Sequence, residues 1–316
     1  MTIRTREWPV PDVPDAGRME SWLRSPDVVR PDGAVTSWSN PAHPGYPYPE
    51  AAGLWLSWAC RPGGPRPDAL ADAVAARLCA DCPRVPGGAG RDGIAYLFDS
   101  AVALAGLLAY RDAGGRVDVI PAVSGLHAFV AERIRRREAS VPAAAGRWSV
   151  EFSPHLFKVA KAILAFDRAS GTRLADDLLP GLSAAWPGAW PRRIYVHAHC
   201  YAVEGLLLMR AAGRGDGLPD PDAEVARLAR WQRADGAMPS HAAGDEPAGE
   251  ARCDATAQAV RLWCRADLDR FAAPIRRALS FLASCQSGPG GIAWAPDDGE
   301  AADVNAWTTL FAVQAV

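Results

Sequence analysis

The sequence has no long hydrophobic run and no large excess of charge of either sign. No stretch approaches the roughly 18 uninterrupted apolar residues that a membrane-spanning helix needs, and 34 basic residues against 36 acidic ones give a net charge of −2. We therefore expect no membrane span and no nucleic-acid partner. The first residues are polar and interrupted by proline, which predicts no secretory signal and a cytoplasmic protein.

Several motifs of cofactor and metal sites are also missing. The sequence has no phosphate-binding GxxxxGK[ST] loop, no GxGxxG that follows a predicted strand and no Gly-x-Ser-x-Gly turn, so we expect no cofactor. Cys79 and Cys82 form a lone CxxC without a second pair, and we predict no metal site there. The seven cysteines are an odd number, which favours free thiols in the expected compartment.

Helical periodicity dominates the chain, and strand-like alternation is almost absent. One type of segment is charged and amphipathic, with apolar residues at i, i+3, i+4 and i+7, which is typical of surface helices. Six such segments occur, at residues 16–24, 68–82, 117–137, 174–186, 221–233 and 269–286.

Between these lie six small, apolar and nearly uncharged segments. A helix that is apolar on all sides is buried on all sides, so the alternation predicts six inner helices wrapped by six outer ones. The expected fold is an all-α, single (α/α)6 toroid spanning residues 1–316, with a short irregular arm at 1–15. Each inner segment begins with a polar residue: Glu50, Asp99, His155, His199, Asp254 and Asn305.

The last repeat resembles those of terpenoid cyclase and protein prenyltransferase toroids. In those repeats an outer helix ends in Gln, a Gly-Gly-aromatic turn follows, and the inner helix begins with Asp and Thr; the matching residues are Gln286, Gly290, Gly291, Trp294, Asp303 and Thr308. A second copy contains Gln232, Gly236 and Asp254. The resemblance implies the fold more than the activity, because the aspartate motifs of those enzymes (DxDD, DDxxD) are absent. Six-hairpin glycosidases, polysaccharide lyases, unsaturated-uronyl hydrolases and sugar 2-epimerases share such a ring and fit equally well.

We expect the functional site at the mouth of the ring where the inner helices begin, since helix N-termini there favour anionic groups. The fourth inner segment is the richest. His197, Tyr201 and Glu204 are spaced i, i+4, i+7 and share one face, and His199 lies among them. A carboxylate as deep as Glu204 either pairs with a cation or has a raised pKa, which suits a general acid. The alternative is that Glu204 braces two helices.

Other inner segments add further candidates. His155 and Lys158 share a helix face, as do Asp254 and Gln258. The alternative role is helix capping for Asp99, Asp254 and Asn305. For Lys158 the alternative is a side chain in solvent. Only one other lysine, Lys161, occurs in the chain. Expected substrate-binding residues are Glu50, Tyr48, Lys158, His197, Gln258, Asp303, Asn305, Trp307 and Trp38.

This polar ring predicts a proton-transfer enzyme, namely a lyase, epimerase or hydrolase of a sugar-like or carboxylated small molecule. We expect His199 or Tyr201 as the base, His155 or Glu204 as the acid that returns the proton, and Lys158 or Gln258 against a developing oxyanion. A hydrolase would instead use Asp99 and Asp254. One alternative is an isoprenoid cyclase or prenyltransferase-like enzyme. The other is a non-catalytic toroid that binds a peptide or protein, in which the polar residues pair with one another and side chains fill the cavity.

Overall fold

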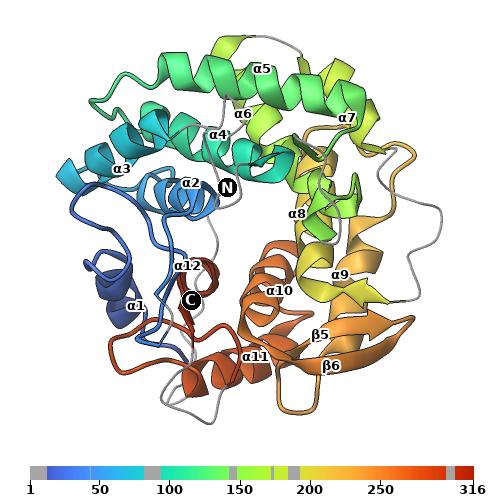
Figure 1. Ribbon diagram of the computed structural model, residues 1–316. Helices are drawn as coiled ribbons and strands as arrows, with labels where there is room; N and C mark the ends of the chain where they lie inside the picture. Colours follow the sequence, from blue (N-terminus) through green and yellow to red (C-terminus); the bar gives the residue numbers. More distant parts are fainter. Residues whose placement is uncertain are drawn as a thin grey trace.

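Twelve α-helices form two concentric rings in the computed structural model, which describes residues 13–42, 44–81, 94–141, 148–171, 174–183, 193–296 and 303–316. Figure 1 looks along the axis of these rings. The outer helices are α1 (Ala16–Leu23), α3 (Ala69–Ala80), α5 (Ile120–Arg136), α7 (Leu174–Ser183), α9 (Pro221–Trp231) and α11 (Ala272–Ser284). The inner helices are α2 (Pro49–Ala59), α4 (Leu97–Asp112), α6 (Ala160–Ser170), α8 (Val196–Ala211), α10 (Cys253–Ala266) and α12 (Ala306–Val313).

The predicted α/α toroid is therefore confirmed. The inner helices contact one another in chain order, and α12 closes the ring by packing against both α10 and α2 (Figure 1). Residues 1–12, most of the predicted N-terminal arm, lie outside the described part of the chain. Among the described residues no helix is long and apolar enough to cross a membrane.

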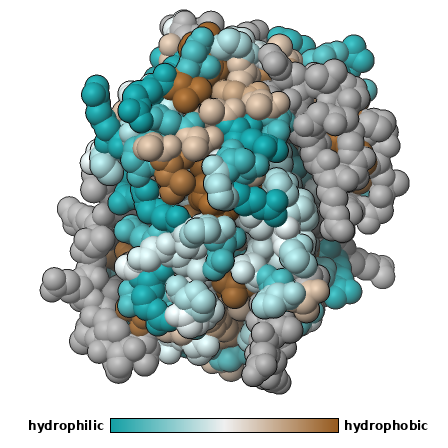
Figure 2. All heavy atoms as spheres, turned by 60° about the vertical axis from the view of Figure 1, so that its left-hand side comes forward, coloured by the Kyte–Doolittle hydropathy of each residue, from teal (hydrophilic) through white to brown (hydrophobic). Residues whose placement is uncertain are grey.

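Local signals explain where the outer helices begin. The side chains of Asp15, Asp68 and Asp220 cap α1, α3 and α9 by accepting hydrogen bonds from backbone N–H groups of the first turn. Pro221 follows its cap at the first helical position, where its missing N–H costs nothing. The outward faces stay polar: on the side of the molecule that Figure 2 shows, hydrophobic residues occur in small groups among hydrophilic ones.

Glycine lets two inner helices approach more closely than larger residues would. A Cβ atom on Gly53 of α2 would lie 2.5 Å from the Val102 carbonyl oxygen of α4, and one on Gly106 of α4 would collide with the backbone at Gly53. Gly205 of α8 packs in the same way against the backbone of Phe157. Phe157 belongs to a 3-10 helix, η2 (Pro154–Val159), which leads into α6.

The expectation of almost no strands was wrong for one part of the chain. A hairpin joins β5 (Met238–Ala243) to β6 (Glu246–Arg252), through a two-residue turn in which Gly244 has φ +63°. β4 (Ile194–Tyr195) adds to this hairpin. Two further pairs are formed by β1 (Trp38–Ser39) with β7 (Val304–Asn305), and by β2 (Ala95–Tyr96) with β3 (Ser140–Val141). Because β2, β4, β6 and β7 each lead directly into an inner helix, the strands build the rim around the helix N-termini.

Candidate functional site

The inner helices bring buried polar side chains together at this N-terminal end. Glu50 comes from α2, His155 and Lys158 come from η2, His197 comes from α8, and Asp254 and Gln258 come from α10. Each of the six is less than 10% exposed. A buried polar group is costly unless it has a partner, so the pairing of these residues decides what they can do.

His197 and Asp254 form the first pair. His197 Nδ1 lies 3.0 Å from Asp254 Oδ2 and 3.0 Å from Gln258 Nε2, and Arg252 donates to Asp254 Oδ2 at 2.6 Å. Burial raises the pKa of Asp254, but the charges of His197 and Arg252 outweigh it and lower that pKa to about 2. Because an ionised carboxylate only accepts, we assign the His197 hydrogen to Nδ1, which leaves Nε2 as the basic nitrogen. With this tautomer the Gln258 amide must turn its oxygen, the acceptor, toward Nδ1.

Tyr201 and Glu50 form the second pair beside the first. The Tyr201 hydroxyl donates to Glu50 Oε1 at 3.3 Å, and the Tyr201 ring centroid lies 4.7 Å from that of His197. Burial raises the pKa of Glu50, and burial together with the nearby carboxylates raises the pKa of Tyr201 well above 10. Tyr201 is thus a neutral hydrogen-bond donor at pH 7, which corrects its expected role as a base.

Lys158 and Glu204 form a third, deeper pair. Lys158 Nζ lies 2.9 Å from Glu204 Oε2, and Arg261 approaches the same carboxylate at 3.5 Å. Burial raises the pKa of Glu204, but these cations outweigh it and hold that pKa well below its usual range. Glu204 is ionised, so the bracing alternative describes it and the general-acid role does not. Lys158 is 5% exposed, which excludes the solvated alternative for this residue.

His199 does not join these pairs. Its Nε2 atom lies 3.2 Å from Glu224 Oε2 of the outer helix α9, and its ring centroid lies 5.0 Å from that of Trp231 on the same helix. It follows His197 by two residues, about 200° around the helix, and therefore faces the outer ring. The structure corrects the expectation that His199 acts as a base at the mouth.

His155 lies at the mouth but cannot be the acid that we predicted. Its Nδ1 atom lies 2.7 Å from the Ser153 hydroxyl, and its ring packs against Phe98. Burial and the neighbouring His197 lower the pKa of His155 to about 3. Its imidazole is therefore neutral at pH 7.

The remaining predicted residues form the rim of the mouth. The Tyr48 hydroxyl lies 3.5 Å from Asp99 Oδ1, and the Tyr48 and Trp307 rings meet edge to face. Trp38 stacks edgewise on Tyr46. The other two predicted residues, Asp303 and Asn305, make contacts that stabilise the fold.

Asn305 caps α12 by accepting from the Thr308 N–H at 3.0 Å, so the capping alternative is correct for Asn305. Asp303 accepts from Asn40 at 2.6 Å. Asp99 and Asp254 lie within the first turns of α4 and α10 and do not occupy the cap positions, which are Tyr96 and Arg252.

The structure adds two residues that the sequence analysis missed, Arg252 and Arg261. Arg252 lies with its guanidinium carbon 3.7 Å from the ring centroid of Trp294 and also faces Tyr195. Arg261 reaches Glu204 from α10. Its position could have been predicted, because residues 254, 258 and 261 are spaced i, i+4, i+7 and share a helix face.

The part of the chain that the structure describes contains no candidate metal site. No three His, Cys, Asp or Glu side chains lie close enough there to hold an ion. Cys82, the second cysteine of the CxxC, lies outside the described residues, so this motif stays untested.

Comparison with solved structures supports the fold. An unsaturated glucuronyl hydrolase specific for heparin superposes with a TM-score of 0.68 over 95% of each chain, at 10% identity. A cellobiose 2-epimerase from Spirochaeta thermophila gives 0.64 over 94% of each chain, at 13% identity. A sugar epimerase from a ruminal bacterium gives 0.66 over 95% of this chain and 97% of its own, at 12% identity.

No family model and no curated protein sequence matches the chain. Identities this low establish a shared architecture and no more. The chain is thus an α/α toroid of the six-hairpin type, with the same fold as these hydrolase and epimerase structures.

Proposed function

We propose that the protein is an acid–base enzyme that acts on a sugar-like or carboxylated small molecule at the N-terminal mouth of the toroid. One observation carries the proposal: a His197–Asp254 pair lies against a Tyr201–Glu50 pair. The first pair has the arrangement of a general base and its orienting carboxylate. The second holds a phenol that stays protonated at pH 7 and a carboxyl group whose pKa is raised by burial.

These groups have complementary roles in a proton transfer. His197 Nε2 takes a proton from substrate carbon, or from the attacking water in a hydrolase, and ionised Asp254 stabilises the resulting imidazolium. Tyr201, the neutral donor of the second pair, donates to the oxygen on which negative charge develops. Gln258 lies beside His197 and positions the imidazole.

The rim supplies groups suited to a polar ring with a negative charge. Trp294 is 37% exposed. Tyr195 and Trp38 are half-buried in strands that lead into an inner helix or pair with such a strand, and Trp307 is half-buried in the first turn of α12. Aromatic faces pack against the apolar faces of sugars. Arg252 offers a cation for a carboxylate, while it also holds Asp254.

The similar structures, a glucuronyl hydrolase and two sugar epimerases, support a sugar substrate and the epimerase or hydrolase class. A hydrolase would use Asp99 together with Asp254. The cytoplasmic location and the absence of macromolecular partners stay predictions. The compared structures give no support to the isoprenoid alternative, and a mouth with this many ionisable groups does not suit a carbocation.

The non-catalytic alternative also predicts that the polar residues pair with one another, so the pairing does not distinguish it from the proposal. Proton NMR in D2O separates the two. The protein is incubated with hexoses, cellobiose, uronates and an unsaturated glucuronyl disaccharide. Exchange of a carbon-bound proton for deuterium reports epimerase or lyase chemistry, and a new reducing end reports hydrolysis.

The same assay includes two variants. His197→Asn is expected to abolish the change, and His127→Asn, a substitution on the outer helix α5, is expected to leave it intact. Turnover that persists in His197→Asn would remove His197 from the mechanism. If no sugar changes with the wild-type protein, the acid–base proposal for this substrate class is wrong.

A further inference from the structure

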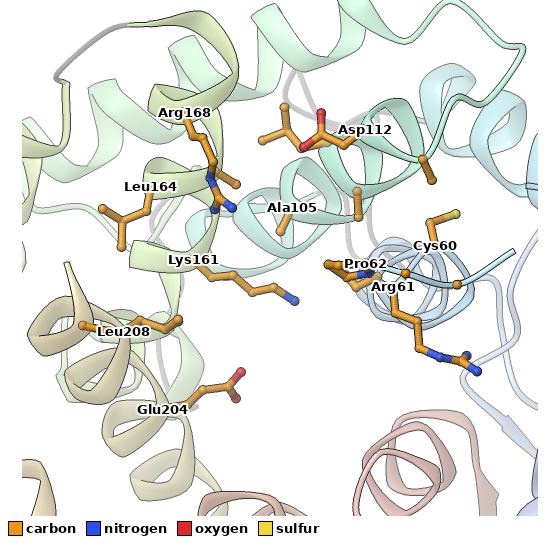
Figure 3. A pocket seen from close by; sticks show the side chains of 18 of the residues that line it. Cys60, Arg61, Pro62, Ala105, Asp112, Lys161, Leu164, Arg168, Glu204 and Leu208 are labelled. Carbon is orange, nitrogen blue, oxygen red and sulfur yellow. The ribbon is translucent and has the colours of Figure 1, made fainter. Parts of the chain in front are cut away.

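A cavity of about 860 Å³ lies at the opposite end of the toroid, among the C-terminal halves of the inner helices. Figure 3 shows Lys161 extending into it from α6 and Glu204 facing it from α8. The layer of Lys158, Glu204 and Arg261 separates this cavity from the mouth, since Lys158 Nζ lies 4.5 Å from the Tyr201 ring centroid on its other side. It is therefore a second compartment, distinct from the proposed active site.

The walls of this cavity are strongly cationic. Six basic residues and only two acidic ones line it, the basic residues being Arg61, Arg66, Lys161, Arg168, Arg261 and Arg265. Both carboxylates are already engaged, because Glu204 is held by Lys158 and Arg261 and Asp112 pairs with Arg111 at 2.8 Å. The lining thus carries positive charge that its own acidic residues do not balance.

Interaction with a helix dipole explains the placement of only two of these basic residues. Arg168 and Arg265 lie in the last turns of α6 and α10, where a cation is favourable. Lys161 lies in the first turn of α6 and Arg261 in the middle of α10, and neither gains from a helix C-terminus. Lys161 forms no ion pair within the described ranges of the chain, and burial with the nearby cations lowers its pKa to about 8.

Apolar side chains lie among these cations. Leu164 of α6, Leu208 of α8 and Leu108 of α4 belong to the cavity lining. A cavity lined by both cations and apolar side chains fits a ligand that has an anionic group and a carbon skeleton. Guanidinium groups match the oxygens of a phosphate group with paired hydrogen bonds.

We propose that this cavity binds a small organic phosphate, with Lys161, Arg168, Arg261 and Arg265 around the phosphate group and Leu164 and Leu208 against the carbon skeleton. The inference goes beyond the proposed function, because it requires neither catalysis nor a ligand at the mouth. A free phosphate ion shares the charged end of the ligand but not its carbon skeleton.

The test is calorimetric titration of the full chain with glucose 6-phosphate, inorganic phosphate and glucose. We expect saturable binding of glucose 6-phosphate, weaker binding of inorganic phosphate, and no binding of glucose to this cavity. Lys161→Gln and Arg265→Gln should each weaken the binding of glucose 6-phosphate about tenfold, the loss of one charge-assisted hydrogen bond. Arg135→Gln, an exposed substitution on α5, is the matched control and should change nothing.

Two further variants separate this site from the mouth. His197→Asn and Trp294→Ala should leave the binding of glucose 6-phosphate unchanged, whatever they do to turnover. Melting curves of the variants without ligand show whether each is folded. Arg168 is exposed, so Arg168→Gln provides a cavity variant that should remain folded. The proposal would be overturned if neither glucose 6-phosphate nor inorganic phosphate bound saturably. It would also be overturned if all cavity variants bound glucose 6-phosphate as tightly as the wild type, or if only Trp294→Ala lost this binding.

Discussion

His197 on α8 and Asp254 on α10 are separated by 57 residues in the sequence, yet the imidazole Nδ1 lies 3.0 Å from the carboxylate Oδ2. The contact depends on two inner helices that begin at the same end of the toroid. It fixes the hydrogen on Nδ1 and leaves Nε2 as the basic nitrogen. The mechanism proposed for the mouth depends on this one relationship.

Replacing Asp254 by Asn should therefore slow turnover while the protein stays folded. An amide can hold His197 in the other tautomer and cannot stabilise an imidazolium, so we expect kcat to fall about 10²- to 10⁴-fold. The double variant His197→Asn/Asp254→Asn should be little slower than His197→Asn, because the two residues act as a unit. Steady-state kinetics on the substrate found by NMR measure this, with His127→Asn as the control. Unchanged kcat in Asp254→Asn would show that the pair is structural.

Glu204 should matter for stability more than for chemistry. Glu204→Gln leaves Lys158 buried without its full countercharge, which typically costs about 3–5 kcal/mol. Lys158→Met/Glu204→Leu should recover most of that loss, because a buried ion pair can be replaced by apolar side chains of similar size. Urea denaturation monitored by circular dichroism compares the three proteins. A Glu204→Gln variant as stable as the wild type would contradict the pairing described here.

Stability should fall as the medium becomes acidic. His155 has a pKa of about 3 against its usual 6.5, so between these values the unfolded chain binds a proton that the folded chain does not, and the free energy of unfolding rises with pH. The lowered pKa values of Glu204 and Asp254 act in the same direction at lower pH. Glu50 acts in the opposite direction, because burial raises its pKa.

Melting temperatures measured from pH 4 to 7 test this pH dependence. The wild-type value should rise over the range, and His155→Gln should flatten the part of the curve between pH 5 and 6.5. An identical curve for His155→Gln would mean that this histidine is not buried in its neutral form.

The close packing of α2 against α4 should make the ring intolerant of added volume at its glycines. Gly106→Ala places a methyl group against the backbone of Gly53, and overpacking of this kind costs about 1–3 kcal/mol. The control is Gly288→Ala, at a position where a Cβ atom meets nothing within 4 Å. Equal melting temperatures for the two variants would show that the helices separate without cost.

The fold was predictable because each repeat carries its own signal. The 3.6-residue period placed the outer helices within a few residues, as for α9, predicted at 221–233 and found at Pro221–Trp231. The hairpin of β5 and β6 was missed because its strands lack the alternation that marks a half-buried sheet. Its register depends on the turn at Gly244 and on contacts with β4 and α10.

The site was only partly predictable, because helix periodicity gives faces but not partners. The i, i+4, i+7 spacing correctly grouped His197, Tyr201 and Glu204 on the face toward the other inner helices. The same spacing excludes His199, whose partner Glu224 lies on an outer helix. Whether Glu204 would be a protonated acid or an ionised partner depended on Lys158 and Arg261, which reach it from two other helices.

The central claim, that the mouth binds a sugar through these pairs, is tested most directly by ligand-dependent thermal stability. A sugar or uronate at 100 times its Kd should stabilise the folded protein by about 2.7 kcal/mol. The account predicts that this gain disappears in Glu50→Gln/His197→Asn and persists in Arg168→Gln. If no sugar or uronate stabilises the wild type, and the double variant is simply less stable, the paired residues at the mouth are structural and the claim is wrong.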